Sequence, residues 1–160
     1  MTHARPIPAP PSKDWRGFRR VTTTTEPAMK CGTVTAGDGC TATAEDYGTA
    51  TAGFAGTALA GYHGTATAGD HGTAVTGAYG TATAGDYGTA IVGDHGTALA
   101  GRGGTILVRY WDTLLGRHRV AVGEVGEGGI EADAAYVAVG GKLTRKDKLT
   151  RKGKLTRKGK

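Results

Sequence analysis

Residues 33–112 consist of ten tandem repeats of an octapeptide, and the first residue of each repeat is Thr, at position 33 and at every eighth position through 105. Its consensus is Thr-Ala-(Thr or aliphatic)-Ala-Gly-x-x-Gly, as in residues 81–88. Internal repetition of this kind fixes the architecture, because each short repeat can bury a face only against its neighbours. The repeat therefore excludes a compact globular core and favours a solenoid.

Each octad predicts one short strand followed by one turn. Its first half alternates Thr with small apolar residues at the period of two that a strand requires. Its second half carries two glycines, which we expect to supply the positive φ angles of a chain reversal. A helix is disfavoured, because a period of eight does not match 3.6 and each Gly would cost about 1 kcal/mol relative to Ala.

The third position of the octad reveals a longer period of sixteen residues. Thr and aliphatic residues alternate there, with Thr43 and Leu99 as the two exceptions. Two octads therefore form one coil of a thin β-solenoid, and ten octads form about five coils. One face of the coil is expected to read Thr-x-Thr, and the opposite face carries an aliphatic column made of Leu59, Val75, Ile91 and Leu107.

The second and fourth positions are mostly Ala, and we expect them to fill the lumen. Burying Ala desolvates no polar group, whereas each buried Thr hydroxyl would need a hydrogen-bond partner. The threonines should therefore face water. Neighbouring strands lie about 4.7 to 4.9 Å apart and alternate residues about 6.6 to 6.8 Å apart, so the Thr-x-Thr face should be a flat two-column grid.

The runs TAGDYGTAIVGDHGTALAG and TAGFAGTALAGYHGTATAG resemble the octad and sixteen-residue repeats of bacterial ice-nucleation proteins. The run RYWDTLLGRHRVAVGEVGEGGIEADAAYV, residues 109–137, resembles the C-terminal cap of the same family. Together the two resemblances cover roughly two thirds of the chain. They imply an ice-binding function carried by the Thr-x-Thr face, which is composed of Thr33, Thr35, Thr49, Thr51, Thr65, Thr67, Thr81 and Thr83.

Aromatic residues are expected to stack along the edges of the solenoid. The seventh positions on one edge form an aromatic ladder of Tyr47, His63, Tyr79 and His95, and those on the other edge read Ala55, His71 and Tyr87. The ladder histidines should lie two coils, about 9.5 Å, apart, which is too far to share a zinc ion. The resemblance implies that the ladder mediates side-by-side multimerisation, and mutual stacking that stiffens the edge is the equal alternative. Aspartates at the turns are interpreted as solvated.

The cap predicted over residues 109–141 differs in kind from the repeats. Tyr110 and Trp111, followed by Asp112, are expected to close the lumen with larger side chains. Val120, Val122 and Val125 alternate and predict a terminal strand or hairpin. We find no catalytic constellation and expect neither an enzyme nor a cofactor, metal or small-molecule substrate.

Composition divides the chain into an arm, a solenoid with its cap, and a tail. Residues 1–30 form a Pro-rich basic arm, with a possible lid over residues 15–30, and carry six basic against two acidic residues. The solenoid is expected over 31–112. Residues 31–141 carry four basic against eleven acidic residues, and residues 142–160 carry ten against one. This tail repeats a basic hexapeptide, for which like-charge repulsion predicts disorder.

Localisation is predicted only by default. We find no signal peptide or membrane-spanning stretch and expect a cytoplasmic protein. Cys31 and Cys40 fall on opposite edges of the coil and are expected to stay reduced, because a disulfide requires Cα atoms within about 7 Å.

The function predicted from the sequence is therefore ice binding or ice nucleation through ordered water on the Thr-x-Thr face, with self-association. A structural or protein-interaction solenoid that uses the aliphatic column is the first alternative. Binding of nucleic acid or an anionic membrane surface through residues 142–160 is the second.

Overall fold

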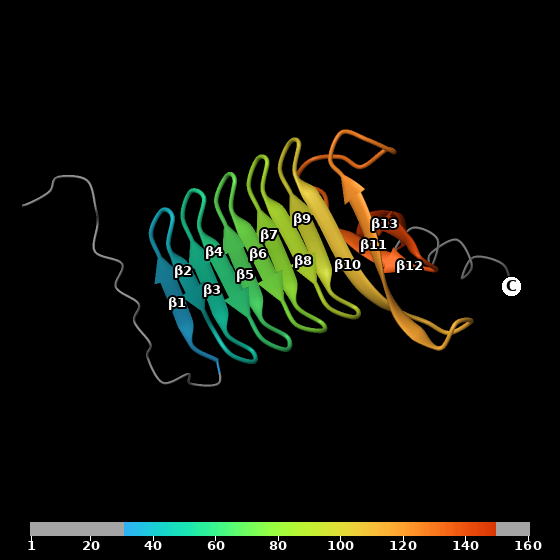
Figure 1. Ribbon diagram of the computed structural model, residues 1–160, viewed down its shortest axis with the longest axis horizontal. Coiled ribbons are helices and arrows are strands. Elements are labelled where there is room, and N and C mark those ends of the chain that lie inside the picture. Colours follow the sequence, from blue (N-terminus) through green and yellow to red (C-terminus); the bar gives the residue numbers. More distant parts are fainter. Residues whose placement is uncertain (1–30, 150–160) are drawn as a thin grey trace, which may run out of the picture.

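A computed structural model describes residues 31–149, which form an elongated all-β solenoid of about five coils (Figure 1). Two sheets make up its walls. Sheet A has the order β1 (Thr33–Ala36), β3 (Thr49–Ala52), β5 (Thr65–Ala68), β7 (Thr81–Ala84), β9 (Thr97–Ala100), β12 (Tyr136–Val139) and β13 (Lys142–Arg145). Sheet B has the order β11 (Arg117–Glu124), β10 (Thr105–Asp112), β8 (Thr89–Val92), β6 (Thr73–Thr76), β4 (Thr57–Ala60) and β2 (Thr41–Thr43).

The strands of successive coils are parallel and pair in a register of sixteen residues. Thr33 lies opposite Thr49 in sheet A, and Leu59 lies opposite Val75 in sheet B. The same offset holds for every parallel pair, so identical octad positions lie in columns. The sixteen-residue coil predicted from the third octad position is confirmed.

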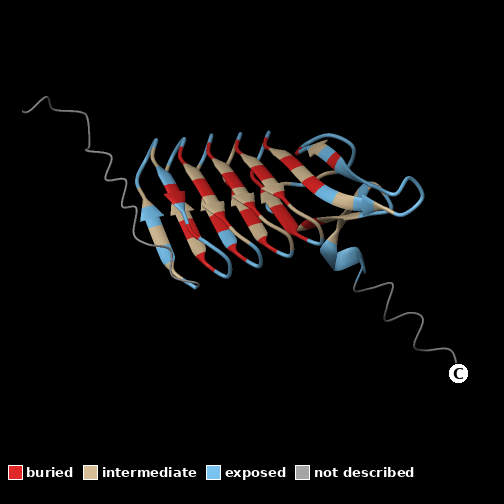
Figure 2. Ribbon diagram, turned by 60° about the horizontal axis from the view of Figure 1, so that its bottom comes forward, coloured by how far each residue is buried: buried red, intermediate tan, exposed pale blue. Residues whose placement is uncertain are grey.

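Alanine fills the lumen, as the sequence predicts. The second-position alanines from Ala42 to Ala98 have no exposed surface, and Ile106 replaces Ala in the last octad without gaining exposure. Buried and partly exposed residues alternate along the repeat strands (Figure 2). The methyl groups of Ala allow the two sheets to approach closely, and the threonines of the first position point outward.

From Gly48 to Gly104, the glycines at the fifth and eighth octad positions are required for close approach, and the prediction that they supply positive φ is wrong. Positive φ falls on the seventh position, which is usually not Gly: φ is 60° at Tyr47, 54° at His63 and 50° at Ala55. A Cβ added to the fifth-position Gly85 would lie 2.2 Å from Asp70 Oδ1, and one added to the eighth-position Gly64 would lie 2.7 Å from the Cβ of Ala60. Only a residue without a side chain fits these positions.

The cap closes the C-terminal end with antiparallel strands. β11 pairs with β10 and extends sheet B, while β12 pairs with β9 at Tyr136 and Ala98. Tyr136 is buried, and its hydroxyl accepts a hydrogen bond from the N–H of Glu131 at 2.7 Å. The side chains that fill this end of the lumen are those of Ile106, Val108, Val125, Ala134 and Tyr136.

The expectation that Tyr110 and Trp111 close the lumen is wrong. β10 continues past Val108 as one arm of a hairpin, so its later residues leave the coil. Trp111 is 51% exposed and Tyr110 is half-buried. The predicted hairpin is confirmed, but Val120 and Val122 face solvent.

The predicted boundary at residue 142 is also wrong, because the first basic hexapeptide belongs to the cap. Gly140 and Gly141 both have positive φ, 55° and 84°, and form a two-residue turn that suits a hairpin. The strand after this turn, β13, pairs with β12, and Leu143 packs against the buried core. Residues 146–149 then form one helical turn.

The remaining predictions for the ends lie outside the described residues. These are the arm over 1–30, its lid over 15–30 and the last part of the tail, 150–160. Within residues 31–149 no helix is long and apolar enough to cross a membrane.

Candidate functional site

The Thr-x-Thr face lies on sheet A, where four successive repeat strands bring its eight threonines into two columns. The strands are β1, β3, β5 and β7. Each column is continuous from one coil to the next, as with Thr35, Thr51 and Thr67. All eight side chains are exposed or partly exposed, and none of their hydroxyls has a hydrogen bond to another residue of 31–149. The face is therefore a regular array of free hydroxyl and methyl groups.

The cap ends the Thr-x-Thr face at β9. Leu99 replaces Thr at the third position there, and Thr97 is buried. Lys146 Nζ donates a hydrogen bond of 3.3 Å to the Thr97 hydroxyl from the helical turn that follows β13. The Thr-x-Thr face is consequently four strands wide, and Lys146 lies at its border.

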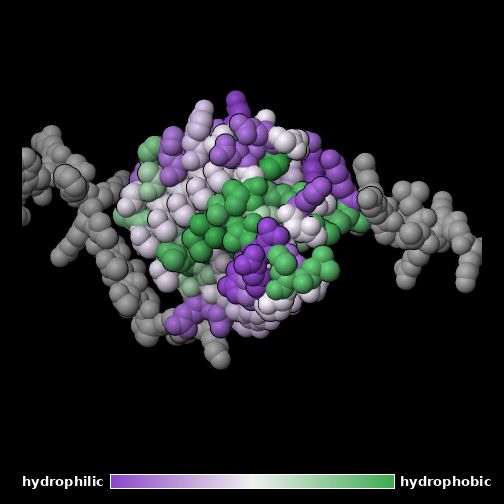
Figure 3. Space-filling view, turned by 45° about the vertical axis from the view of Figure 1, so that its right-hand side comes forward, coloured by the Kyte–Doolittle hydropathy of each residue, from purple (hydrophilic) through white to green (hydrophobic). Residues whose placement is uncertain are grey.

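The aliphatic column lies on the opposite wall, sheet B, and the cap extends it. Leu59, Val75, Ile91 and Leu107 are in register and partly exposed. Val122 on β11 lies beside Leu107 and is 59% exposed, which adds a fifth residue that sequence reasoning did not include. Figure 3, which brings the cap end forward, shows apolar residues beside a group of strongly hydrophilic ones.

The aromatic ladder is stacked along one edge of the solenoid. Successive ring centroids of Tyr47, His63, Tyr79 and His95 are 5.4, 5.1 and 5.0 Å apart, and adjacent planes differ by 5°, 13° and 19°. Tyr62 packs edge-on against three of these rings. On the other edge the rings of His71 and Tyr87 stack at 5.3 Å. The predicted stacking is confirmed.

A row of aspartates joins the coils, and the interpretation of these residues as merely solvated is wrong. Asp38 Oδ1 accepts a hydrogen bond from the N–H of Phe54 at 2.9 Å, sixteen residues away. On the same edge, Asp70 and Asp86 accept the corresponding hydrogen bonds from Asp86 and Arg102 at 2.9 and 2.8 Å, and on the opposite edge Asp46 accepts one from Tyr62 at 2.7 Å. The recurrence of Asp at the sixth octad position was the sequence signal that could have predicted these hydrogen bonds between coils.

Asp94 ties the projecting hairpin to the aromatic edge. Its Oδ2 lies 3.3 Å from His118 Nδ1, and its Oδ1 lies 4.0 Å from Arg109 Nε. The second distance is beyond hydrogen-bond range, which leaves Oδ1 buried without a hydrogen-bond partner among residues 31–149.

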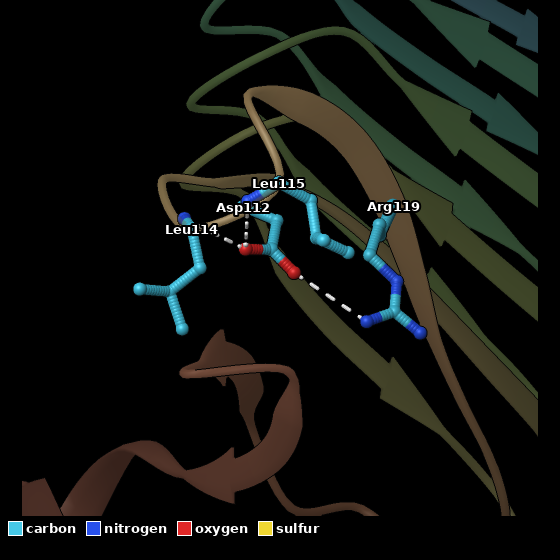
Figure 4. A network of polar contacts seen from close by, with 4 residues as sticks. All are labelled: Asp112, Leu114, Leu115 and Arg119. Carbon is cyan, nitrogen blue, oxygen red and sulfur yellow. Dashed lines mark hydrogen bonds and ion pairs between the residues drawn. The ribbon is translucent and has the colours of Figure 1, made fainter.

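Asp112 organises the turn of the β10–β11 hairpin (Figure 4). Its Oδ1 accepts hydrogen bonds from the N–H groups of Leu114 and Leu115 at 3.0 and 3.2 Å, and its Oδ2 lies 3.4 Å from Arg119 Nη1. The Leu115 hydrogen bond lowers the pKa of the Asp112 carboxyl most, desolvation opposes it, and Leu114 and Arg119 lower the pKa further. All three contacts favour the ionised carboxylate.

The other predicted features of the described chain concern metals and cysteines. Within residues 31–149 no group of three or more His, Cys, Asp or Glu side chains is placed to hold a metal ion. Cys31 and Cys40 are both free.

Comparisons with protein-family models, with curated proteins and with solved structures find no match to this chain. The repeats and the fold define a Thr-rich tandem-repeat β-solenoid.

Proposed function

We propose that this protein binds ice through the Thr-x-Thr face and orders water on it, in the manner of an ice-nucleation protein. The observation that carries the proposal is the register of β1, β3, β5 and β7, which places eight threonines in two straight columns. A strand spacing of about 4.7 to 4.9 Å repeats each hydroxyl and methyl at a fixed interval, so bound water would be held in a regular pattern.

The chemistry of the face suits ordered water better than a folded macromolecule. Each Thr offers a hydroxyl that both donates and accepts hydrogen bonds, next to a methyl group that does neither. The coils beneath are joined by backbone pairing and by the aspartate row, so the array is held rigid. A rigid array requires little reorganisation when water orders on it.

The size of the face implies self-association. Its four strands at this spacing span only about 14 Å, which is a small template for a growing crystal. The aromatic ladder offers an edge on which chains could meet side by side, because its rings are exposed and already ordered by stacking, so they can bury further apolar surface at little cost in conformational entropy. We therefore propose that the active species is a multimer.

The proposal is tested by freezing droplets of the purified chain and by measuring thermal hysteresis and ice-crystal shape. Ice binding predicts faceted crystals or a raised freezing temperature that depends on protein concentration. Crystals and freezing temperatures equal to those of a protein without a Thr array, at matched concentration, would contradict it.

A second candidate function is a structural or protein-interaction solenoid. The observation that favours it is the exposed aliphatic column, which Val122 extends from the repeats onto the cap. A contiguous apolar strip on an otherwise polar surface often marks a protein contact. This candidate predicts association without any effect on ice.

A third candidate function is binding of nucleic acid or an anionic surface through the basic tail. The first hexapeptide of that tail is part of the cap, so fewer basic residues are left to bind such a partner. Lys142 and Arg145 belong to β13, and Arg145 contacts Glu131 and lies 3.1 Å from Asp147. The two later hexapeptides lie mainly outside the described residues.

A further inference from the structure

The β10–β11 hairpin projects from the body of the solenoid (Figure 1), and two exposed leucines lie in its turn. Leu114 is 96% exposed, and Leu115 is exposed beside it. We call residues 113–116 the leucine tip. Leu114 gains almost no packing within the fold and about half of the Leu115 side chain is exposed, so the two adjacent leucines form an apolar patch at the end of the hairpin.

Hydrogen bonds order the turn of the leucine tip, and both leucine side chains are exposed there. Asp112 accepts hydrogen bonds from the N–H groups of both leucines and contacts Arg119 across the turn (Figure 4). Gly116 has a φ of 60°, which closes the reversal. Behind the tip, the rings of Trp111 and His118 pack edge to face with centroids 4.9 Å apart.

Positive charge gathers around the same hairpin. Of the four basic residues between positions 31 and 141, three lie within residues 109–119: Arg109, Arg117 and Arg119. Asp112 faces Arg119, and Asp94 faces Arg109 and His118, so both acids offset part of this charge. Residues 31–108 carry six acidic residues and one basic residue, Arg102, so the hairpin is a basic site beside an acidic solenoid, and Lys142, Arg145, Lys146 and Lys148 form a second basic group in the cap.

We propose that the leucine tip inserts into the surface of an anionic lipid bilayer. Leu114 and Leu115 would enter the boundary between headgroups and acyl chains, Trp111 would lie at the interface, and Arg117 and Arg119 would contact lipid phosphates. A narrow convex tip with a basic rim fits a deformable anionic surface. A protein groove would instead need a complementary concave partner. The proposal is independent of the ice-binding function.

Trp111 provides a direct measure of insertion. The chain has two tryptophans, so Trp15→Phe in the full-length protein leaves Trp111 as the sole reporter. The fluorescence of this protein is measured with vesicles of phosphatidylcholine, alone or mixed with an equal part of phosphatidylglycerol. Insertion predicts a blue shift of Trp111 emission and quenching by brominated acyl chains on the mixed vesicles, and a smaller effect on phosphatidylcholine alone.

Two paired substitutions separate the tip from the rest of the chain. Leu114→Ser with Leu115→Ser should abolish the blue shift and weaken partitioning on the order of tenfold per leucine, while salt-sensitive co-sedimentation through the basic tail persists. Leu59→Ser with Val75→Ser removes two apolar side chains from the aliphatic column and should leave the shift unchanged. Circular dichroism is used to check that both variants remain folded.

Several outcomes would overturn the proposal. The first is the absence of a blue shift with any vesicle, and the second is a shift that survives the double leucine substitution. An equal shift on pure phosphatidylcholine would remove the anionic requirement. A shift that grows with protein concentration without vesicles would show that a second copy of the chain, and not lipid, covers the tip.

Discussion

At the scale of the single residue, Thr76 carries a hydroxyl that the lumen does not accommodate. Thr76 stands at the fourth octad position, where Ala is usual, and its buried Oγ1 has no hydrogen-bond partner among the described residues. Its neighbour in the next coil is Val92, which has the same shape without the hydroxyl. Thr76→Val should therefore raise the free energy of unfolding by about 1 kcal/mol.

Urea unfolding followed by circular dichroism measures this change. Thr73→Val on the outer face of the same strand is the matched control, because its hydroxyl can bond to water and its loss should change stability by less than about 0.5 kcal/mol. If Thr76→Val destabilises the protein, the hydroxyl has a partner after all.

The pKa of Asp112 predicts a pH-dependent turn. Hydrogen bonds from the turn lower the pKa of this carboxyl in the folded protein, so its stabilising contribution is present above the unfolded value of 3.8 and is lost as pH falls through the lower folded value. Amide exchange at Leu114 and Leu115 should accelerate over that range, after correction for intrinsic rates. In Asp112→Asn the protection should already be reduced at neutral pH and should show no such titration.

At the scale of the element, the two outer faces of the solenoid can be changed separately. Thr51→Lys with Thr67→Lys places two charges on the Thr-x-Thr face, and Val75→Lys with Ile91→Lys does the same to the aliphatic column. Both pairs lie on partly exposed, outward-facing strand positions, so each substitution should change the free energy of unfolding by less than about 1 kcal/mol. The first pair should abolish ice shaping or any raised freezing temperature. The second pair should preserve ice activity and the association through the aromatic ladder, and should weaken only contacts that use the aliphatic column.

Droplet freezing, crystal morphology and sedimentation distinguish these results. If both pairs, or neither, alter ice activity in folded protein, the assignment of the faces is mistaken and the scaffold function takes its place.

The strands were predictable because the octad pattern depends on local chemistry and on one period. The alternation of Thr with Ala indicated the strand and its buried side, the alternation of Thr with aliphatic residues at the third octad position indicated the sixteen-residue register, and the ring positions indicated the ladder. The hydrogen bonds of the aspartate row were missed, because they depend on how one turn lies over the next. β13 was missed as well, because its Lys and Arg suggest a solvated tail and only its pairing with β12 makes it a strand. The exposure of Trp111 follows from the length of β10, which composition does not determine.

At the scale of the whole molecule, the first basic hexapeptide contributes to the stability of the cap. β13 covers the edge of β12, and Leu143 contributes to the core beneath it. Deleting residues 142–160 should therefore lower the thermal midpoint and promote aggregation through the exposed edge of sheet A. Deleting only residues 150–160 removes much of the same charge and should leave the midpoint unchanged.

Differential scanning calorimetry and light scattering on the two truncated proteins test this expectation. Equal midpoints would show that the first hexapeptide does not contribute to the stability of the cap.

The sixteen-residue register also restricts how such a gene can grow or shrink. Slippage that adds two octads lengthens the protein by one rung of about 4.8 Å and leaves every downstream residue on its original wall. Slippage that adds one octad exchanges the walls for everything after it, so threonines would continue an aliphatic column and rings would change edge. Inherited length variants that keep both faces should therefore differ by even numbers of octads.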